Sequence, residues 1–226
     1  MTTKSPVLPL LLLLPAPSIS VLLSMVIAPG CIFGKLIFLF FKLWILLIPL
    51  FWLLVIEKQK LSCSRPRCGG LTVGAALGIF ISIIIVIMYA ATGRFCIQPQ
   101  MLKQMASKIG LTNPYIYLAA AAYWILLNSL LEEYVWRWFV VKQCRLFMTP
   151  LAAIIISAIF FTLHHIIAMQ IYLNWLLVTI ASMGIFSAAA LWSWCYLRYQ
   201  SIWPGYLSHA IVDITVFAIG YHLIFQ

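Results

Sequence analysis

Charged residues are scarce in this chain, and acidic residues are the scarcest among them. Charged residues make up 8% of the 226 positions against 65% for hydrophobic residues, and Asp and Glu together number only four. Because a soluble globular domain carries about 25% charged residues, this composition excludes a soluble protein. It predicts an all-α, polytopic transmembrane helical bundle without a separate soluble domain.

Metal-binding cysteine patterns are also lacking, and the basic residues are spread over several short loops. The formal net charge is +10, but Lys and Arg are scattered between apolar runs, which is typical of orientation signals and of contact with membrane lipid. Nucleic acid is therefore not an expected partner. Cys63 and Cys68 share a loop, but no His or second cysteine pair accompanies them. Free thiols are the default expectation, with lipidation or weak metal binding as alternatives.

Seven apolar runs are present, each near the ~20 residues that a helix needs to cross a bilayer. Pro15 and Pro17 should kink the first run, and Lys42 lies deep in the second run without an evident partner. The expected spans are about Val7–Pro29, Ile32–Ile56, Leu71–Ala91, Pro114–Trp138, Pro150–Ile171, Asn174–Leu197 and Ile202–Phe225.

The basic residues also predict how the chain is oriented. The Glu57–Gly70 loop carries the strongest basic cluster and is expected on the cytoplasmic side, which places the N-terminus inside and the C-terminus outside. The polar segment 92–113 falls outside despite its basic residues. Its apolar residues recur at helical spacing, which indicates an interfacial amphipathic helix. We divide the chain into N-terminal spans with the basic loop and this segment (1–112) and a helical core (113–226).

Two of the four acidic residues, Glu132 and Glu133, are adjacent near the far end of the fourth apolar run. Charged side chains at membrane depth cost about 2.5–3.5 kcal/mol each on insertion scales, so they usually have a function. On a helix, Glu133 and Arg137 lie four apart on one face, in the favourable order for an ion pair. Glu132 points roughly 100° away. The sequence therefore predicts one glutamate held by Arg137 and one left free for chemistry.

Further ionisable residues lie in two later spans. His164 and His165 are in the fifth span, and His209 and Asp213 lie four apart in the seventh. Such groups tend to face the bundle interior and meet one another, because lipid offers no partner. A carboxylate with imidazoles can activate water, bind a metal such as zinc, or relay protons in a transporter. Spacing alone does not choose among these functions.

Three short motifs follow one another on separate spans. They are Glu132-Glu133-x-x-x-Arg137, Phe161-x-x-x-His165 and His209-x-x-x-Asp213, the last preceded by Ser201-Ile202-Trp203-Pro204. Together they resemble the motifs of the CPBP intramembrane proteases (CAAX protease and bacteriocin-processing, or Abi), over about Pro114 to Gly220. The pair Phe160 and His164 has the same spacing as the second motif, but the preceding Ser157 favours His165. Asp213 stands where this family often has Asn.

The resemblance implies a role for each motif residue. Glu132 is similar to the general base that activates the attacking water. Glu133 and Arg137 would shape the site, and His165 would help to hold the water. His209 and Asp213 occupy the oxyanion-stabilising positions, although a charged Asp213 would instead orient His209.

The resemblance implies an intramembrane endopeptidase that hydrolyses a peptide bond in a peptide or membrane-anchored protein substrate. We expect it as a multi-pass protein of a bacterial cytoplasmic membrane, without a cofactor, zinc being the alternative. Two other functions stay open. One is a non-catalytic membrane partner of the bacteriocin immunity or secretion type. The other is a proton-coupled transporter, against which the lack of internal repeats counts.

Overall fold

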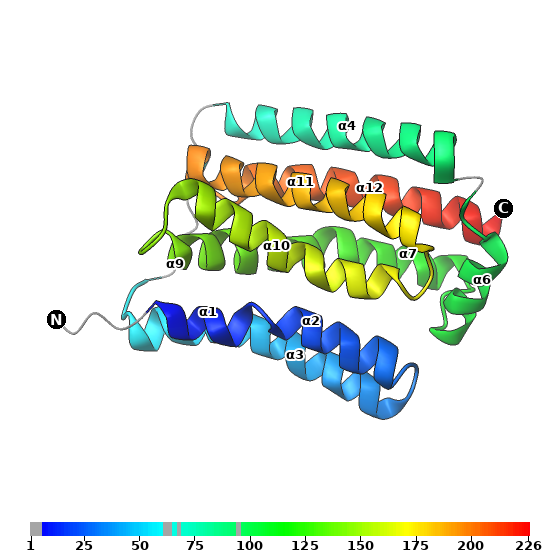
Figure 1. Ribbon diagram of the computed structural model, residues 1–226, viewed down its shortest axis with the longest axis horizontal. Coiled ribbons are helices and arrows are strands. Elements are labelled where there is room, and N and C mark those ends of the chain that lie inside the picture. The colour runs from blue at the N-terminus through cyan, green and yellow to red at the C-terminus, as the bar shows by residue number, and fades with distance from the viewer. Residues whose placement is uncertain (1–5, 61–64, 67–68, 94–95) are drawn as a thin grey trace.

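The computed structural model describes residues 6–60, 65–66, 69–93 and 96–226, and the regular structure of these residues is helical throughout (Figure 1). Seven of their helices are long and apolar enough to cross a membrane. The predicted all-α bundle of about seven spans is thereby confirmed. Cys63 and Cys68 lie outside the described residues, so their expected state stays a prediction.

An N-terminal hairpin, residues 7–56, forms one edge of the bundle (Figure 1). Trp44 Nε1 donates a hydrogen bond of 3.0 Å to the carbonyl of Leu12 and links the two arms. Gly30 turns the chain between them with a φ of +73°, a conformation that suits glycine. The first arm is interrupted near its prolines, as predicted. The arms consist of α1 (Val7–Leu13), α2 (Ala16–Val21) and the π-helical η1 (Leu22–Ile27), then α3 (Ile32–Phe51) and the π-helical η2 (Trp52–Ile56).

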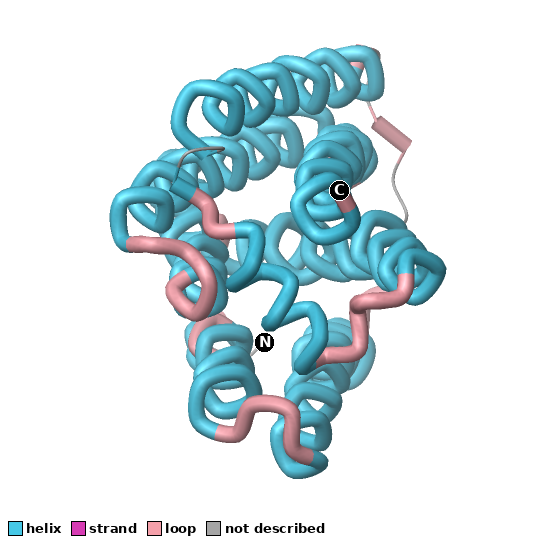
Figure 2. The backbone as a smooth tube through the Cα atoms, turned by 90° about the vertical axis from the view of Figure 1, so that its right-hand side faces the viewer, coloured by secondary structure: helices cyan, strands magenta, loops and turns pink. Residues whose placement is uncertain are grey.

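The opposite edge is α4 (Gly70–Met88), which continues into η3 (Tyr89–Gly93) and packs along α12 (Trp203–Phe225) (Figures 1 and 2). Glycines make this approach close. A Cβ at Gly74 would overlap the carbonyl of Pro204, and a Cβ at Gly78 would lie 2.9 Å from the Cβ of Ile211. Small residues at helix interfaces let backbones approach in this way. As a result, α4 supports the helix that carries His209 and Asp213.

The fourth span is longer than the sequence suggested. It covers 31 residues and ends at Cys144, where the expected end was Trp138. Residues 139–141 are at most 1% exposed, so the helix continues because its side chains still face the core. The two glutamates therefore lie well inside the span and not at its far end. The span alternates between α7 (Pro114–Tyr123), η4 (Trp124–Asn128), α8 (Ser129–Glu132), η5 (Glu133–Val141) and α9 (Lys142–Cys144), of which η4 and η5 are π-helical.

The last three spans are α10 (Pro150–Met169), α11 (Trp175–Tyr199) and α12. Their boundaries lie within two residues of the expected ones. Thr149 and Asn174 cap the first two by accepting hydrogen bonds from backbone N–H groups of the first turn, as such residues commonly do.

The segment expected at the membrane interface contains α6 (Pro99–Lys108), whose Ala106 is buried while Lys103 and Lys108 are exposed. Figure 1 shows α6 at the same end of the bundle as the C-terminus, with the N-terminus at the other end. Termini at opposite ends agree with an odd number of spans. The assignment of these ends to the inner and outer membrane faces stays a prediction.

One buried cluster joins the N-terminal hairpin to the fourth span. Leu13, Ile45 and Trp52 of the hairpin belong to the same core as Val135 and Phe139 of η5. Because this core contains residues from both sides of position 112, the N-terminal spans and the C-terminal half share apolar packing. The division of the chain at that residue stays a prediction.

Candidate active site

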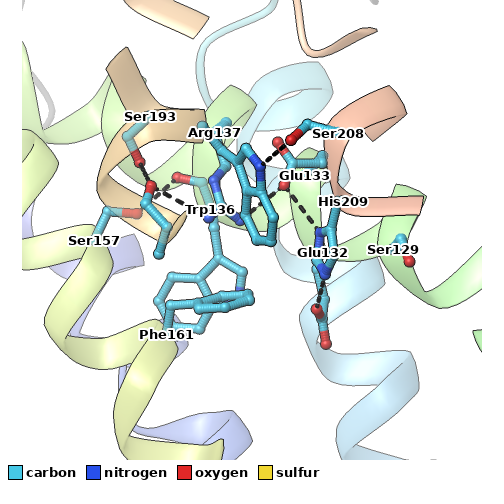
Figure 3. Close-up of polar contacts among 12 residues, drawn as sticks. Ser129, Glu132, Glu133, Trp136, Arg137, Ser157, Phe161, Ser193, Ser208 and His209 are labelled. Carbon is cyan, nitrogen blue, oxygen red and sulfur yellow. Dashed lines mark hydrogen bonds and ion pairs between the residues drawn. The ribbon is translucent and has the colours of Figure 1, made fainter. Parts of the chain in front are cut away.

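Three spans bring the predicted site residues together, and Figure 3 shows Glu132, Glu133, Arg137 and His209 among them. The fourth span supplies Glu132 and Glu133, α10 supplies His164 and His165, and α12 supplies His209. In Figure 3, His209 lies between the two glutamates. Residues from distant parts of the sequence therefore form one polar cluster inside an apolar bundle.

Glu133 and Arg137 form a buried ion pair. Glu133 Oε1 lies 3.0 Å from Arg137 Nη1, and both side chains are fully buried. The Arg137 guanidinium also lies over the rings of Phe161 and Trp192, at 4.7 and 5.1 Å from their centroids. A buried charge needs such partners, because an unpaired one is strongly unfavourable. The sequence predicted this pairing from the spacing of the two residues.

Gly205 of α12 leaves room for the ion pair of Glu133 and Arg137. It lies so close to Glu133 that a Cβ at position 205 would overlap the Glu133 carboxylate. Ser208, one turn later, accepts a hydrogen bond of 2.9 Å from Trp192 Nε1. The first turns of α12 are thus packed closely against the buried glutamate, and the carboxylate has little freedom to move.

Glu132 has a different environment, as expected from its direction on the helix. Its side chain is 13% exposed, whereas that of Glu133 is inaccessible. Asn128 Nδ2 donates a hydrogen bond of 2.9 Å to Glu132 Oε1, and Glu132 Oε2 lies 3.6 Å from His209 Nε2. Glu132 is therefore the more accessible of the two glutamates and has no arginine bound to it.

His209 contacts both glutamates. Its Nδ1 lies 3.2 Å from Glu133 Oε1, so Nδ1–H donates to that carboxylate and Nε2 is directed toward Glu132. Trp192 stacks on the imidazole with a centroid distance of 4.1 Å and an interplanar angle of 18°. The buried pair and the indole together fix the orientation of the ring, and a fixed ring can present Nε2 to a reacting group.

Asp213 lies at the edge of the cluster. Its Oδ2 accepts a hydrogen bond of 2.5 Å from Ser129 Oγ and lies 3.9 Å from His209 Nε2. The close contact of Asp213 is therefore with Ser129, and the longer distance to His209 is beyond direct hydrogen bonding. Its role as an oxyanion-stabilising or His209-orienting residue stays a prediction.

Both histidines of α10 lie beside Glu132. His165 Nδ1 is bonded to the carbonyl of Phe161 at 2.9 Å, and His164 Nδ1 contacts the carbonyl of Phe160 at 3.4 Å. Each ring therefore carries its proton on Nδ1 and leaves Nε2 free. His164 is more buried and lies parallel to Trp136, with ring centroids 5.9 Å apart. Proximity to Glu132 alone does not separate these two residues.

Two residues that connect to Glu132 were missed by the sequence interpretation. Asn128 and Lys42 join Glu132 in a chain of contacts, because Lys42 Nζ donates to Asn128 Oδ1. The only signal in the sequence was the unexplained depth of Lys42 in its span. Ser157, noted for its position before Phe161, has a clear structural role, since its hydroxyl donates to the carbonyl of Trp136 at 3.2 Å and joins α10 to η5.

The site also contains a set of residues that could hold a metal ion. One ligand atom from each of Glu132, His164 and His165 lies within 4.8 Å of the others. A carboxylate with two imidazoles suits zinc, and backbone carbonyls that bind the Nδ1–H groups are typical partners of metal-bound histidines. These residues therefore fit zinc, which would polarise a bound water there. His209 does not belong to this set, although it also contacts Glu132.

The fold and the site define a multi-pass integral membrane protein with a carboxylate–imidazole centre inside its helical bundle. The family model described as type II CAAX prenyl endopeptidase Rce1-like matches residues 114–215. The match covers just under half of the chain, and it confirms the resemblance of this segment to the CPBP (CAAX protease) family that was seen in the motifs. The match supports a CAAX-type intramembrane protease that acts on a membrane-associated peptide or protein. Searches of curated proteins and of solved structures found no match.

Proposed function

We propose that the chain is an intramembrane endopeptidase in which Glu132 is the general base that activates a water molecule. The observation that carries this proposal is the difference between the two glutamates. Glu133 is neutralised by Arg137 and inaccessible, whereas Glu132 is partly exposed and lies among three imidazoles. A base must be reachable by water and unpaired with a permanent cation, and Glu132 fits that requirement better than Glu133.

The proposed reaction has two proton transfers. Glu132 removes a proton from water as the water oxygen attacks the scissile carbonyl carbon, and the carbonyl oxygen becomes an oxyanion. His209 Nε2, when protonated, donates a hydrogen bond to that oxyanion. The C–N bond then breaks, and the proton held by Glu132 passes to the leaving amine. His165 helps to hold the water through Nε2.

The proposed substrate is a peptide attached to the membrane. The matching family model names a CAAX prenyl endopeptidase, so a prenylated peptide with a C-terminal CAAX sequence is the first candidate. The site lies within spans that are apolar on their lipid-facing sides. A substrate with its own lipid anchor would therefore reach the site from the bilayer, with the peptide bond held near the membrane.

The test is cleavage of a pool of membrane-anchored peptides by the purified protein, with prenylated CAAX peptides and unprenylated versions of the same sequences. The parent should cleave at least one peptide, and Glu132→Gln should lose at least 1,000-fold in kcat/KM, within the range for a general base. Glu57→Gln is the matched control, because Glu57 lies outside the site. A Glu132→Gln variant as active as the parent would disprove the proposal.

A strong chelator separates two versions of the mechanism. Activity that survives the chelator supports water activation by Glu132 without a metal. Activity that is lost and then restored by zinc supports a metal-dependent mechanism, for which Glu132, His164 and His165 are the candidate ligands. If the folded parent cleaves no peptide in the pool, the non-catalytic membrane partner becomes the better interpretation.

A further inference from the structure

The N-terminal hairpin places one charged side chain in the site. Lys42 of α3 donates to Asn128 Oδ1, and Asn128 Nδ2 in turn donates to Glu132 Oε1 at 2.9 Å. Lys42 lies outside residues 114–215, the segment that matches the family model. The catalytic glutamate is thus linked through one amide to a part of the chain that carries no family motif.

The burial of Lys42 argues against an incidental contact. Lysine can extend along a helix toward the interface and keep its ammonium in water. Lys35, two helical turns earlier on the same helix, is exposed, whereas Lys42 is partly buried and hydrogen-bonded between spans. Because a charged residue at membrane depth is costly, the ammonium group needs the partners that it has.

We propose that Lys42 is a positioning residue for catalysis, which orients the Asn128 amide so that its NH₂ group donates to Glu132. An ammonium group only donates hydrogen bonds, so it selects the carbonyl oxygen of the amide and turns the NH₂ group toward the carboxylate. Without Lys42, the amide could rotate and present its oxygen to Glu132, which would repel the ionised carboxylate. This inference rests on the proposed role of Glu132.

Lys42 also places a positive charge near Glu132, to which it is linked through the Asn128 amide. The other ionisable groups facing Glu132 come from α10 and α12. They are His164, His165, His209 and Asp213, and Glu133 with Arg137 follows on its own span. A lysine and an amide together hold the base in one orientation, and fixed orientation of catalytic groups accounts for much of enzymatic rate.

The test compares kcat and KM for three variants of the full-length protein. Lys42→Met should lower kcat about 10–100-fold, the range for residues that orient a catalytic group, with little change in KM. Lys42→Arg should keep most of the activity, because a guanidinium also only donates. Lys35→Met is the matched control and should behave as the parent. A Lys42→Met variant with the parent's kcat would overturn the proposal.

Asn128→Asp separates positioning from simple structural support. Aspartate still binds Lys42, so the tie between α3 and the fourth span is kept, but it has no NH₂ group to donate to Glu132. We expect Asn128→Asp to lose as much kcat as Lys42→Met while its melting temperature stays near that of the parent. An active Asn128→Asp would show that the contact only joins two helices. This variant also decides the matter if Lys42→Met fails to fold.

The same variants distinguish the failure of this inference from the failure of the proposed function. If the parent is active and Glu132→Gln is not, normal kcat values for Lys42→Met and Asn128→Asp refute only the positioning role. If the folded parent is inactive on every substrate, the catalytic role of Lys42 is refuted together with the proposed function. A double-mutant cycle on melting temperatures would then show whether Lys42 and Asn128 interact.

Discussion

The adjacent residues Glu132 and Glu133 have different surroundings in this site. Glu133 shares its buried space with Arg137 and His209, whereas Glu132 faces Asn128 and the α10 histidines. The difference follows from the rotation of about 100° between consecutive helical residues. Because of it, mutations at adjacent positions should separate stability from activity.

We predict that Glu133→Gln is mainly destabilising and that Glu132→Gln is not. Removing one partner of a buried ion pair costs about 3–5 kcal/mol, because the other charge is left uncompensated. At roughly 2–4 °C per kcal/mol for a chain of this size, Glu133→Gln should lower the melting temperature in detergent on the order of 10 °C. Glu132→Gln should stay within a few degrees of the parent.

The double variant Glu133→Gln/Arg137→Met is the control for this explanation. It removes both charges, so it should recover part of the stability lost in Glu133→Gln. Equal melting temperatures for Glu133→Gln and the parent would contradict the importance of the buried pair.

The two histidines of α10 should also differ. His165 is bonded to Phe161 and leaves Nε2 free, while His164 lies parallel to Trp136 like a packed aromatic ring. In a metal-free site, His165→Phe should lower kcat at least 100-fold, and His164→Phe should keep most of it. Cleavage assays on the two purified variants decide between the residues. An equal and large loss of kcat in both variants would instead favour zinc binding by Glu132, His164 and His165.

One contact beside Glu132 was predicted correctly from sequence spacing alone. Glu133 and Arg137 interact within one helix, so their spacing in the sequence is enough to pair them. Lys42 and Asn128 interact across 86 positions of sequence, and no helical periodicity connects them. Which helix faces which is decided by the packing of the whole bundle, so this contact could not be predicted from the sequence.

At the scale of helices, the close packing of α4 on α12 supports the site. Seven spans were found where the hydropathy predicted them, because a helix needs a long apolar run to cross the bilayer. The extent of the fourth span was not predicted, since Lys142 and the following residues look like a loop. In the structure Lys142 bonds to Gln59 at 3.1 Å, and Gln143 donates to Glu57 at 2.6 Å. These tertiary contacts stabilise the last helical turn, which ends at Cys144.

We predict that Gly74→Val impairs both stability and catalysis, whereas Gly184→Ala impairs neither. A side chain at Gly74 would meet the backbone of Pro204, which cannot move without shifting the start of α12. Overpacking of this kind typically costs about 1–3 kcal/mol. At Gly184, within α11, a Cβ meets nothing within 4 Å, and alanine favours a helix by up to ~1 kcal/mol.

Melting temperatures and kcat measured on both glycine variants check this prediction. Gly74→Val should melt lower and turn over more slowly, because α12 carries His209. A Gly74→Val variant with normal kcat would show that α4 is only a cover for the bundle and does not support the site.

At the scale of the whole molecule, the hairpin and the segment that matches the family model pack as one unit. The hairpin contributes Lys42 to the site, and the hydroxyl of Tyr134 in η5 donates to the carbonyl of Leu46 in α3 at 3.2 Å. Leu13 and Trp52 complete the core around Phe139. The sequence showed no role for these first spans, because their contacts with the rest of the chain are packing contacts and a few hydrogen bonds, including that of the partly buried Lys42.

We predict that the chain without residues 1–60 is inactive and that residues 1–60, expressed beside it as a separate polypeptide, restore activity. Loss of the hairpin exposes the core around Phe139 to lipid and removes the donor that orients Asn128. Two pieces divided in a loop can reassociate because close side-chain packing and interhelical hydrogen bonds join them. Cleavage by membranes containing one or both pieces gives the readout.

Lys42→Met in the separate hairpin isolates the contribution of the side chain from that of packing. This hairpin should still associate with the remaining chain, as measured by co-purification, but restore at most about one-tenth of the activity, in line with the ~10–100-fold loss expected for a residue that orients a catalytic group. Full restoration by the Lys42→Met hairpin would mean that the first two spans act by packing alone. Activity of the chain without residues 1–60 would mean that the segment matching the family contains the complete catalytic site.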